Sequence, residues 1–202
     1  MKNFVIGMGV LLAAATAANA QVWNEVGDAG ELAASAQVVA GSGPLTTILG
    51  SLSDSDVDMY QIRIDDPSLF IAQHTNVFNF DSQMWLFNMD GTGVAFNDDT
   101  TGLRSQISNP AVAAGNYLLA ISGYDRDAVD SNGAALWLDT PFNNQRAPDG
   151  PGAANPVAGW QGTGGNRGDY EIAIRGASFV PAPGALALAG MGGALIGRRR
   201  RK

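Results

Sequence analysis

Aspartates are the residues of this sequence whose types and spacing could do chemistry. Asp54, Asp56 and Asp58 stand at alternate positions, so on an extended backbone their side chains leave the same face and converge. Three converging carboxylates repel one another unless a cation or solvent neutralises them. The stretch predicts either a calcium site, because Ca²⁺ prefers carboxylate oxygens, or a turn whose Asp side chains accept hydrogen bonds from backbone amides.

Two further Asp-rich stretches stand later in the chain. Asn97–Asp99 closes an apolar run, and the loop Tyr124–Gly133 carries oxygen donors at Asp125, Asp127 and Asp130. Flexible loops of this kind supply the several oxygen ligands that hard cations need, although they also form turns that cap themselves. We expect Asn97–Asp99 to meet the later loop at one end of the fold. The candidate calcium ligands are Asp54, Asp56, Asp58, Asp98, Asp99, Asp125, Asp127 and Asp130.

Other kinds of site find little support in the sequence. The absence of cysteine excludes cysteine catalysis and disulfides, and a single histidine, His74, excludes a His-rich metal site. The helix-flanked calcium loop is rejected, because its sixth position holds Met59 instead of Gly and its twelfth holds Asp65 instead of Glu. A polysaccharide-active enzyme using Asp98 and Asp125 is the catalytic alternative, but no Glu stands in an apolar setting that would raise its pKa. We therefore expect a non-catalytic protein.

The elements that position these groups read as β-strands. In Ser82–Asp99, apolar and aromatic residues alternate, and Asp90-Gly91 supplies a hairpin turn. Further strands are predicted at Leu45–Leu52, Met59–Ile64, Leu69–Thr75, Gly115–Gly123 and Gly168–Gly176. The last two begin with the same frame, which is Gly, then Asn or Asp, then Tyr. We expect each Tyr to point into the core and anchor its strand. We predict an all-β fold, a single antiparallel, jelly-roll-like β-sandwich over residues 21–179.

One long connection interrupts this pattern. Residues 140–167 are rich in Gly, Pro and Asn and are too long for an ordinary loop. They form either a functional loop laid on the surface or a partly ordered insertion. Within them, Trp160 either stacks on a sugar or anchors the loop to the domain.

The charge of the central part limits its partners. Nineteen acidic and six basic residues give the stretch between the two ends a formal charge of −13. Such a surface repels nucleic acid, so no nucleic-acid partner is expected. It either attracts divalent cations or simply keeps the protein soluble.

The N-terminus predicts export. Lys2 precedes the apolar run Phe4–Ala15, and Ala18-Asn19-Ala20 fits the small residues that a signal peptidase requires. Residues 1–20 therefore read as a signal helix that is removed after Ala20.

The C-terminus, residues 180–202, predicts a sorting segment. Pro181-Ala182-Pro183 precedes a short apolar run at the lower length limit of a transmembrane helix. A basic cluster follows, which should hold this end in the cytoplasm during export. It consists of Arg198, Arg199, Arg200, Arg201 and Lys202.

This tail resembles the PEP-CTERM sorting signal of Gram-negative and related bacteria. Pro181 and Pro183 match the two prolines of the Pro-Glu-Pro motif, and Ala182 replaces its Glu. The resemblance implies processing by an exosortase-type enzyme in the inner membrane and release to the cell surface or extracellular polysaccharide. A permanently membrane-anchored surface protein is the alternative.

The central domain resembles the β-sandwich of bacterial pre-peptidase C-terminal (PPC-like) domains. The matching residues are Asp54–Tyr60, Phe80–Phe87, Asn97–Asp99 and Ala114–Gly123, all within residues 54–123. The resemblance implies a non-catalytic structural or binding module, in a family whose related modules bind calcium and, in some cases, matrix polymers. We expect an exported protein with a transient inner-membrane tether, and calcium, if the Asp-rich loops bind it, would stabilise the domain.

Overall fold

The computed structural model describes residues 21–75, 77, 80–100, 102–163, 165 and 167–182. The predicted signal helix with Ala18 and Ala20, and the sorting segment from Pro183 through Arg198–Arg201, lie outside these residues. Within them the regular structure is entirely β, which confirms the predicted all-β class. No helix in this described part is long and apolar enough to cross a membrane.

Twelve strands are present among the described residues. They are β1 (Val22–Asn24), β2 (Gln37–Val38), β3 (Pro44–Leu52), β4 (Val57–Ile64), β5 (Ile71–His74), β6 (Ser82–Phe87), β7 (Gly93–Asn97), β8 (Gln106–Ser108), β9 (Gly115–Gly123), β10 (Asp127–Val129), β11 (Gly159–Gln161) and β12 (Gly168–Ser178). All the strands that the sequence predicted exist, with ends shifted by a few residues. The additional strands are short, and their sequences carry too few residues to show a period.

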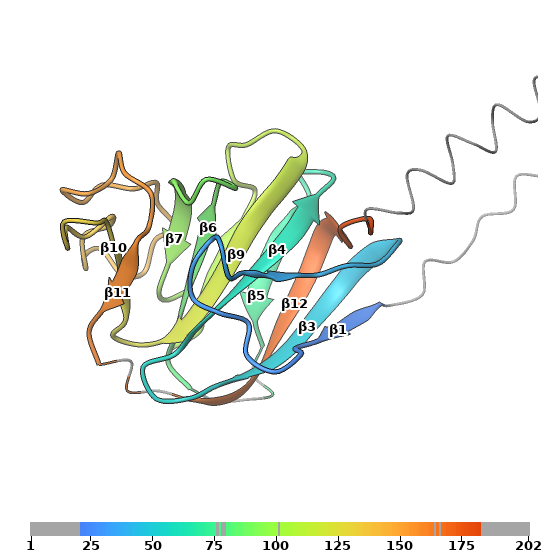
Figure 1. The fold of residues 1–202 in the computed structure, drawn as a ribbon, viewed down its shortest axis with the longest axis horizontal. Coiled ribbons are helices and arrows are strands. Elements are labelled where there is room, and N and C mark those ends of the chain that lie inside the picture. Colours follow the sequence, from blue (N-terminus) through green and yellow to red (C-terminus); the bar gives the residue numbers. More distant parts are fainter. Residues whose placement is uncertain are drawn as a thin grey trace, which may run out of the picture.

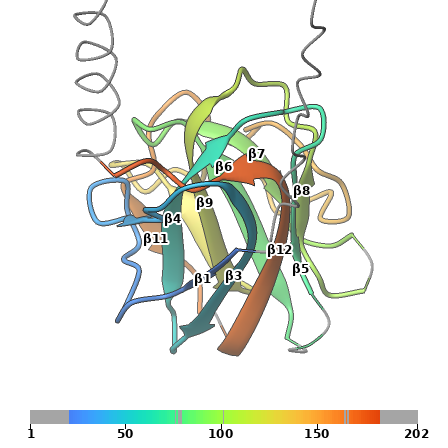
Figure 2. The same cartoon turned by 90° about the vertical axis from the view of Figure 1, so that its right-hand side faces the viewer.

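The strands form two layers. In one layer β7, β6, β9 and β4 lie side by side, with β2 along β4; in the other, β1, β3, β12, β5 and β8 follow one another. In Figure 2, β1, β3 and β12 of the second layer face the viewer, with β5 and β8 to their right. The layers join where Ala177 and Ser178 at the end of β12 pair with Ile64 and Arg63 of β4.

The sandwich is not wholly antiparallel, which corrects the prediction. β1 pairs with β3 in parallel, and so does β2 with β4. A parallel pair needs a long crossover connection, and residues 25–43 between β1 and β3 provide one. Both pairs involve the N-terminal segment, which runs along the body in blue in Figure 1.

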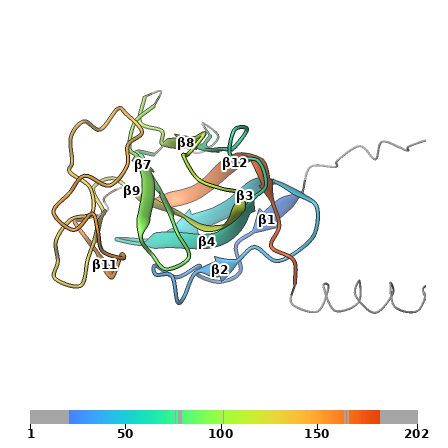
Figure 3. The same ribbon diagram turned by 90° about the horizontal axis from the view of Figure 1, so that it is seen from above.

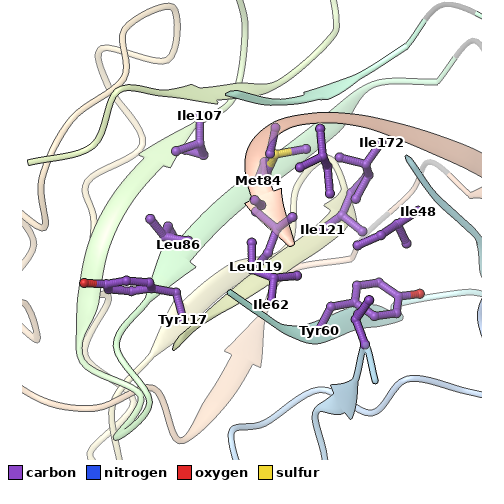
Figure 4. Packing of buried hydrophobic residues seen from close by; sticks show 14 of the residues in the cluster. Ile48, Tyr60, Ile62, Met84, Leu86, Ile107, Tyr117, Leu119, Ile121 and Ile172 are labelled. Carbon is purple, nitrogen blue, oxygen red and sulfur yellow. The ribbon is translucent and has the colours of Figure 1, made fainter. Parts of the chain in front are cut away.

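The main core fills the space between the layers. Alternate residues of β4, Tyr60, Ile62 and Ile64, point inward as predicted, and they meet residues of β6, β9 and β12 (Figure 4). Tyr117 and Tyr170 both lie in this core, as the shared frame of their strands indicated. Burying a large apolar side chain contributes about 1.5–3 kcal/mol, so this cluster supplies much of the stability of a chain without disulfides.

A second core covers the outer face of the first layer. Trp85 and Phe87 of β6 point outward from the sandwich, yet both are buried. Residues 124–161, which include β10 and β11, lie over them and supply Trp137 and Trp160. This segment stands beside β7 and β9 in Figure 3. Most of the long connection predicted at 140–167 is therefore part of an ordered third layer.

Trp160 anchors this layer. Its ring packs edge-on against Trp85, with centroids 4.9 Å apart, and its Nε1 donates a hydrogen bond of 2.8 Å to the carbonyl oxygen of Glu31. Because the side chain is buried, it presents no face to a sugar. The structure supports the anchoring interpretation of Trp160.

Candidate metal centre

An acidic pocket of about 480 Å³ opens at one end of the first layer. Its lining combines residues before β6, after β7, after β9 and in the third layer. They are Asp81, Gln83, Asp98, Asp99, Tyr124, Asp125, Asp127, Asp139, Thr140 and Phe142. Six are aspartates, and none of the lining residues carries a positive charge.

Backbone hydrogen bonds hold the segments of the pocket together. The amide of Tyr124 donates to the carbonyl oxygen of Asp81 at 3.0 Å, which joins the end of β9 to the start of β6. The amide of Asp99 donates to the carbonyl oxygen of Phe142 at 3.1 Å, which joins the turn after β7 to the third layer. The pocket walls are therefore fixed by the pairing of β6, β7 and β9.

Two polar side chains fix the loops. Asn97 accepts a 2.8 Å hydrogen bond from the amide of Gln106 and donates one of 3.0 Å to the carbonyl oxygen of Asp99. Gln83 accepts a 2.9 Å hydrogen bond from the amide of Arg126 and donates one of 3.3 Å to Asp127. Buried side-chain amides satisfied on both sides in this way make a loop rigid.

Three carboxylates converge in this pocket. Oxygens of Asp81, Asp98 and Asp99 lie within 4.8 Å of one another. Asp98 is only 5% exposed, and its Oδ1 is buried without a hydrogen-bond partner among the described residues. Asp99 Oδ1 is in the same situation. A buried carboxylate oxygen without a donor is costly, so its position calls for a proton or a cation.

The pKa values of the pocket aspartates reflect the cost of burying these carboxylates close to one another. Burial, followed by the charges of neighbouring aspartates, raises the pKa of Asp98 to about 7. Burial and Asp99 raise the pKa of Asp81 to about 6, and burial together with Asp125 raises that of Asp127 to about 6. A bound divalent cation would reverse these effects, because it stabilises the charged form of each carboxylate.

The structure brings together half of the predicted ligands. Asp98, Asp99, Asp125 and Asp127 all line the pocket, where the sequence expected the turn after β7 to meet the later loop. Their role as calcium ligands stays a prediction. Asp130 lies elsewhere: it accepts hydrogen bonds from the amides of Asn132 and Ala134 and from the side chain of Asn155, which hold its pKa below its usual value.

Asp54, Asp56 and Asp58 do not form one cluster. A turn precedes β4 at Asp54, so the backbone is not extended over all three residues. Asp54 forms an exposed ion pair with Arg167, and Asp56 accepts hydrogen bonds from the amides of Ser53 and Val57. Turn capping therefore accounts for Asp56, while Asp58 points into the core.

Asp58 belongs to a buried polar network. Tyr170 donates a 2.6 Å hydrogen bond to Asp58 Oδ2, and the hydroxyls of Tyr170 and Tyr60 are hydrogen-bonded to each other. Oxygens of Glu25 and Asp28 approach Asp58 closely enough to form a second acidic group. Burial raises the pKa of Asp58 to about 8, partly offset by the Tyr170 hydrogen bond.

His74 is buried and hydrogen-bonded. Its Nδ1 lies 2.9 Å from Ser82 Oγ, which in turn lies 2.8 Å from Ser105 Oγ. All three residues have 0% exposure, so this Ser–His contact is inaccessible to a substrate.

Sequence reasoning missed Asp81, Asp139 and the role of Gln83. Asp81 stands directly before a predicted strand, and the pairing of that strand with the returning one would have placed it beside Asp98 and Asp99. Asp139 carries no such signal, because it stands alone in an irregular segment.

The fold and pocket together define an all-β domain with a candidate metal centre. No family model matches the sequence, and no curated protein matches it. Among solved structures, the pre-peptidase C-terminal domain of a collagenase from Bacillus anthracis is similar at 14% sequence identity and a TM-score of 0.38, covering 79% of this chain and all of that one.

Proposed function

We propose that this protein is an exported, non-catalytic binding module whose acidic pocket holds a divalent cation, with calcium the best match. The buried, unpartnered Oδ1 of Asp98 carries the proposal, because Asp81 and Asp99 face it within 4.8 Å. Calcium takes six to eight oxygens in flexible geometry, and all the charged lining residues of the pocket offer oxygen. A cysteine-free domain gains rigidity when a cation joins the ends of its strands.

The pocket is a better calcium site than the Glu25–Asp28–Asp58 group. Asp58 has a pKa of about 8 and keeps a proton at neutral pH, so a proton already fills the role of a cation there. Both oxygens of Glu25 accept backbone hydrogen bonds, from the amides of Ala29 and Ser51. Asp58 Oδ1, like Asp98 Oδ1, is buried without a hydrogen-bond partner among the described residues. The difference lies in the hydrogen bonds to Asp58 Oδ2 and Glu25 and in the open pocket around Asp98.

The test is calcium binding by isothermal titration calorimetry and thermal unfolding in millimolar calcium against EDTA. Extracellular calcium modules bind with a Kd of about 10⁻⁴ M or weaker. A tenfold excess of calcium over such a Kd stabilises the folded protein by about 1.4 kcal/mol, which corresponds to a rise in Tm of about 3–6 °C. Identical unfolding curves in the two buffers would reject the proposal.

Matched variants locate the site. Asp98→Asn should abolish the rise in Tm, whereas Asp58→Asn should leave it in place, because Asp58 belongs to the second acidic group. Asp169→Asn, at an exposed position of β12, changes the net charge equally and serves as the control. If Asp58→Asn alone removes the response, the cation occupies the other group.

A polysaccharide-active enzyme is the second candidate. The raised pKa of Asp98 and its position in one pocket with Asp125 are the features that such an acid–base pair needs. Release of reducing ends from a panel of bacterial polysaccharides, lost in Asp98→Asn, would establish it. Calcium-dependent stabilisation without such activity would support the binding module.

We further propose that the module is delivered to the cell surface or extracellular polysaccharide through its C-terminal sorting segment. The motif begins at Pro181, shortly after the end of β12 at Ser178 and directly after the bridge between Val180 and Ala40, so it would leave the body there. An exosortase-type enzyme is the expected processing partner, and the inner membrane the transient tether.

A further inference from the structure

The acidic pocket is much larger than a cation requires. Its volume is about 480 Å³, whereas a water molecule occupies about 30 Å³ in the liquid. Sites for small organic molecules have volumes of about 300–1,000 Å³. The pocket therefore has room for a small organic molecule beside an ion.

The charges of the pocket restrict the chemistry of that molecule. Lined by six aspartates and no basic residue, the pocket would repel an anionic ligand. A carboxylate accepts hydrogen bonds and donates none, so the matching ligand carries donors. Hydroxyl groups fit, because a hydroxyl donates a hydrogen bond to one group while its oxygen can bind a cation.

Coordination by the three converging aspartates would be incomplete. Asp81, Asp98 and Asp99 supply at most six carboxylate oxygens, and only if all three bind in bidentate fashion. Calcium accepts six to eight oxygens, so positions remain for two oxygens from a ligand. Asp125, Asp127 and Asp139 stand in the same pocket as acceptors for the remaining hydroxyls.

Two aromatic residues distinguish this pocket from a simple ion site. Tyr124 is 47% exposed and Phe142 is 50% exposed, and both line the pocket. The tryptophans Trp85, Trp137 and Trp160, by contrast, are buried. An exposed aromatic ring has an apolar face, which a sugar ring can cover with its C–H groups.

We propose that the pocket binds a saccharide, with two adjacent hydroxyls on the cation and the sugar ring against Phe142 and Tyr124. This inference rests on the proposed cation at Asp81, Asp98 and Asp99. It assigns to Tyr124 and Phe142 the stacking role that the sequence had offered as one alternative for Trp160. An organic amine is the rival ligand, and it would compete with calcium instead of requiring it.

The test is saturation-transfer NMR on the purified exported protein with mannose, glucose, galactose and arabinose, each in millimolar calcium and in EDTA. We expect at least one sugar to bind in calcium and none in EDTA. Phe142→Ala should weaken sugar binding about five- to tenfold, as loss of a stacked ring does, without changing calcium affinity. Leu138→Ala is the matched control, because Leu138 is 50% exposed in the same segment and outside the pocket.

The outcomes separate the two proposals. Calcium binding without binding of any of the four sugars would overturn the saccharide inference and leave the cation site standing. Absence of calcium binding would overturn both. Displacement of calcium by spermidine, with no effect of the sugars, would show that the pocket takes organic cations.

Discussion

Asp98 is one of the pocket residues that make the stability of the protein depend on pH. Its pKa in the folded protein, about 7, lies above the value of 3.8 expected for the unfolded chain. The folded state therefore holds the proton more tightly, and this contribution to stability is complete below about pH 4 and lost as the pH rises through 7. Above that pH the ionised carboxylate destabilises the cation-free protein.

Asp98→Asn should accordingly stabilise the calcium-free protein at pH 8. We expect the free energy of unfolding in EDTA to rise by roughly 1–3 kcal/mol, measured with urea. In calcium the advantage of the variant over the wild type should shrink by about 1.4 kcal/mol, because only the wild type gains the free energy of cation binding. A variant that is destabilised in both buffers would show that Asp98 is satisfied without a cation.

His74 shows the opposite dependence. Burial, together with the charge of Arg104, lowers its pKa from 6.5 to about 4, so the folded protein holds the imidazole neutral. Its contribution to stability is complete above pH 6.5 and is lost as the pH falls from 6.5 towards 4.

The His74 titration can be measured directly, because the sequence contains only one histidine. We expect its imidazole NMR resonances to titrate well below pH 6.5. His74→Gln should reduce the acid-induced loss of stability by up to about 3 kcal/mol relative to its value at pH 8. Titration of the wild-type imidazole near 6.5 would contradict the buried, neutral state.

At the scale of elements, the third layer depends on Trp160. Its side chain packs on Trp85 and Phe87, and its Nε1 bonds to Glu31 in the N-terminal segment. Trp160→Ala should lower the free energy of unfolding by about 3–5 kcal/mol, whereas Phe142→Ala, at an exposed ring, should change it by about 0.5 kcal/mol or less. Equal effects in urea unfolding would show that Trp160 does not anchor the layer.

The hydrogen bond between Asp58 of β4 and Tyr170 of β12 leads to a second prediction at the scale of elements. Because burial raises the pKa of Asp58 to about 8, stability should fall as the pH rises through 8. Asp58→Asn retains an acceptor for the hydroxyl of Tyr170 and cannot ionise, so its thermal stability should change less between pH 6 and pH 9. A wild type with equal Tm at both pH values would contradict the buried, protonated carboxyl.

At the scale of the whole molecule, the two ends should be processed. We expect intact-mass spectrometry of the surface fraction to give a mature protein that begins at Gln21 and lacks Arg198–Lys202. The membrane fraction of cells without the exosortase-type enzyme should retain the C-terminal basic cluster. An unprocessed C-terminus in the surface fraction would instead indicate a permanent anchor.

The strands that the sequence predicts well are those with a clear period. Met59–Ile64 alternates apolar and polar residues, and Asp90-Gly91 places the hairpin turn, where Gly91 adopts a φ of 86°. Gly115–Gly123 is apolar on both faces, which indicates a strand buried on both sides, and Leu118, Leu119 and Ala120 are fully buried. The sequence could not indicate that residues 124–161 cover the outer face of the first layer, because this Gly- and Pro-rich segment shows no periodicity.

The sequence by itself determined the all-β class, the main strands and the Asp-rich turns, because these depend on local periodicity and turn chemistry. Only the tertiary structure decided which aspartates share a site. Asp98 and Asp99 join Asp81 and Asp125 because β6 pairs with both β7 and β9, whereas Asp56 and Asp130 cap their own turns. Carboxylates converge here because strands distant in the sequence pair with one another. The alternate spacing of Asp residues along the chain does not predict such a convergence.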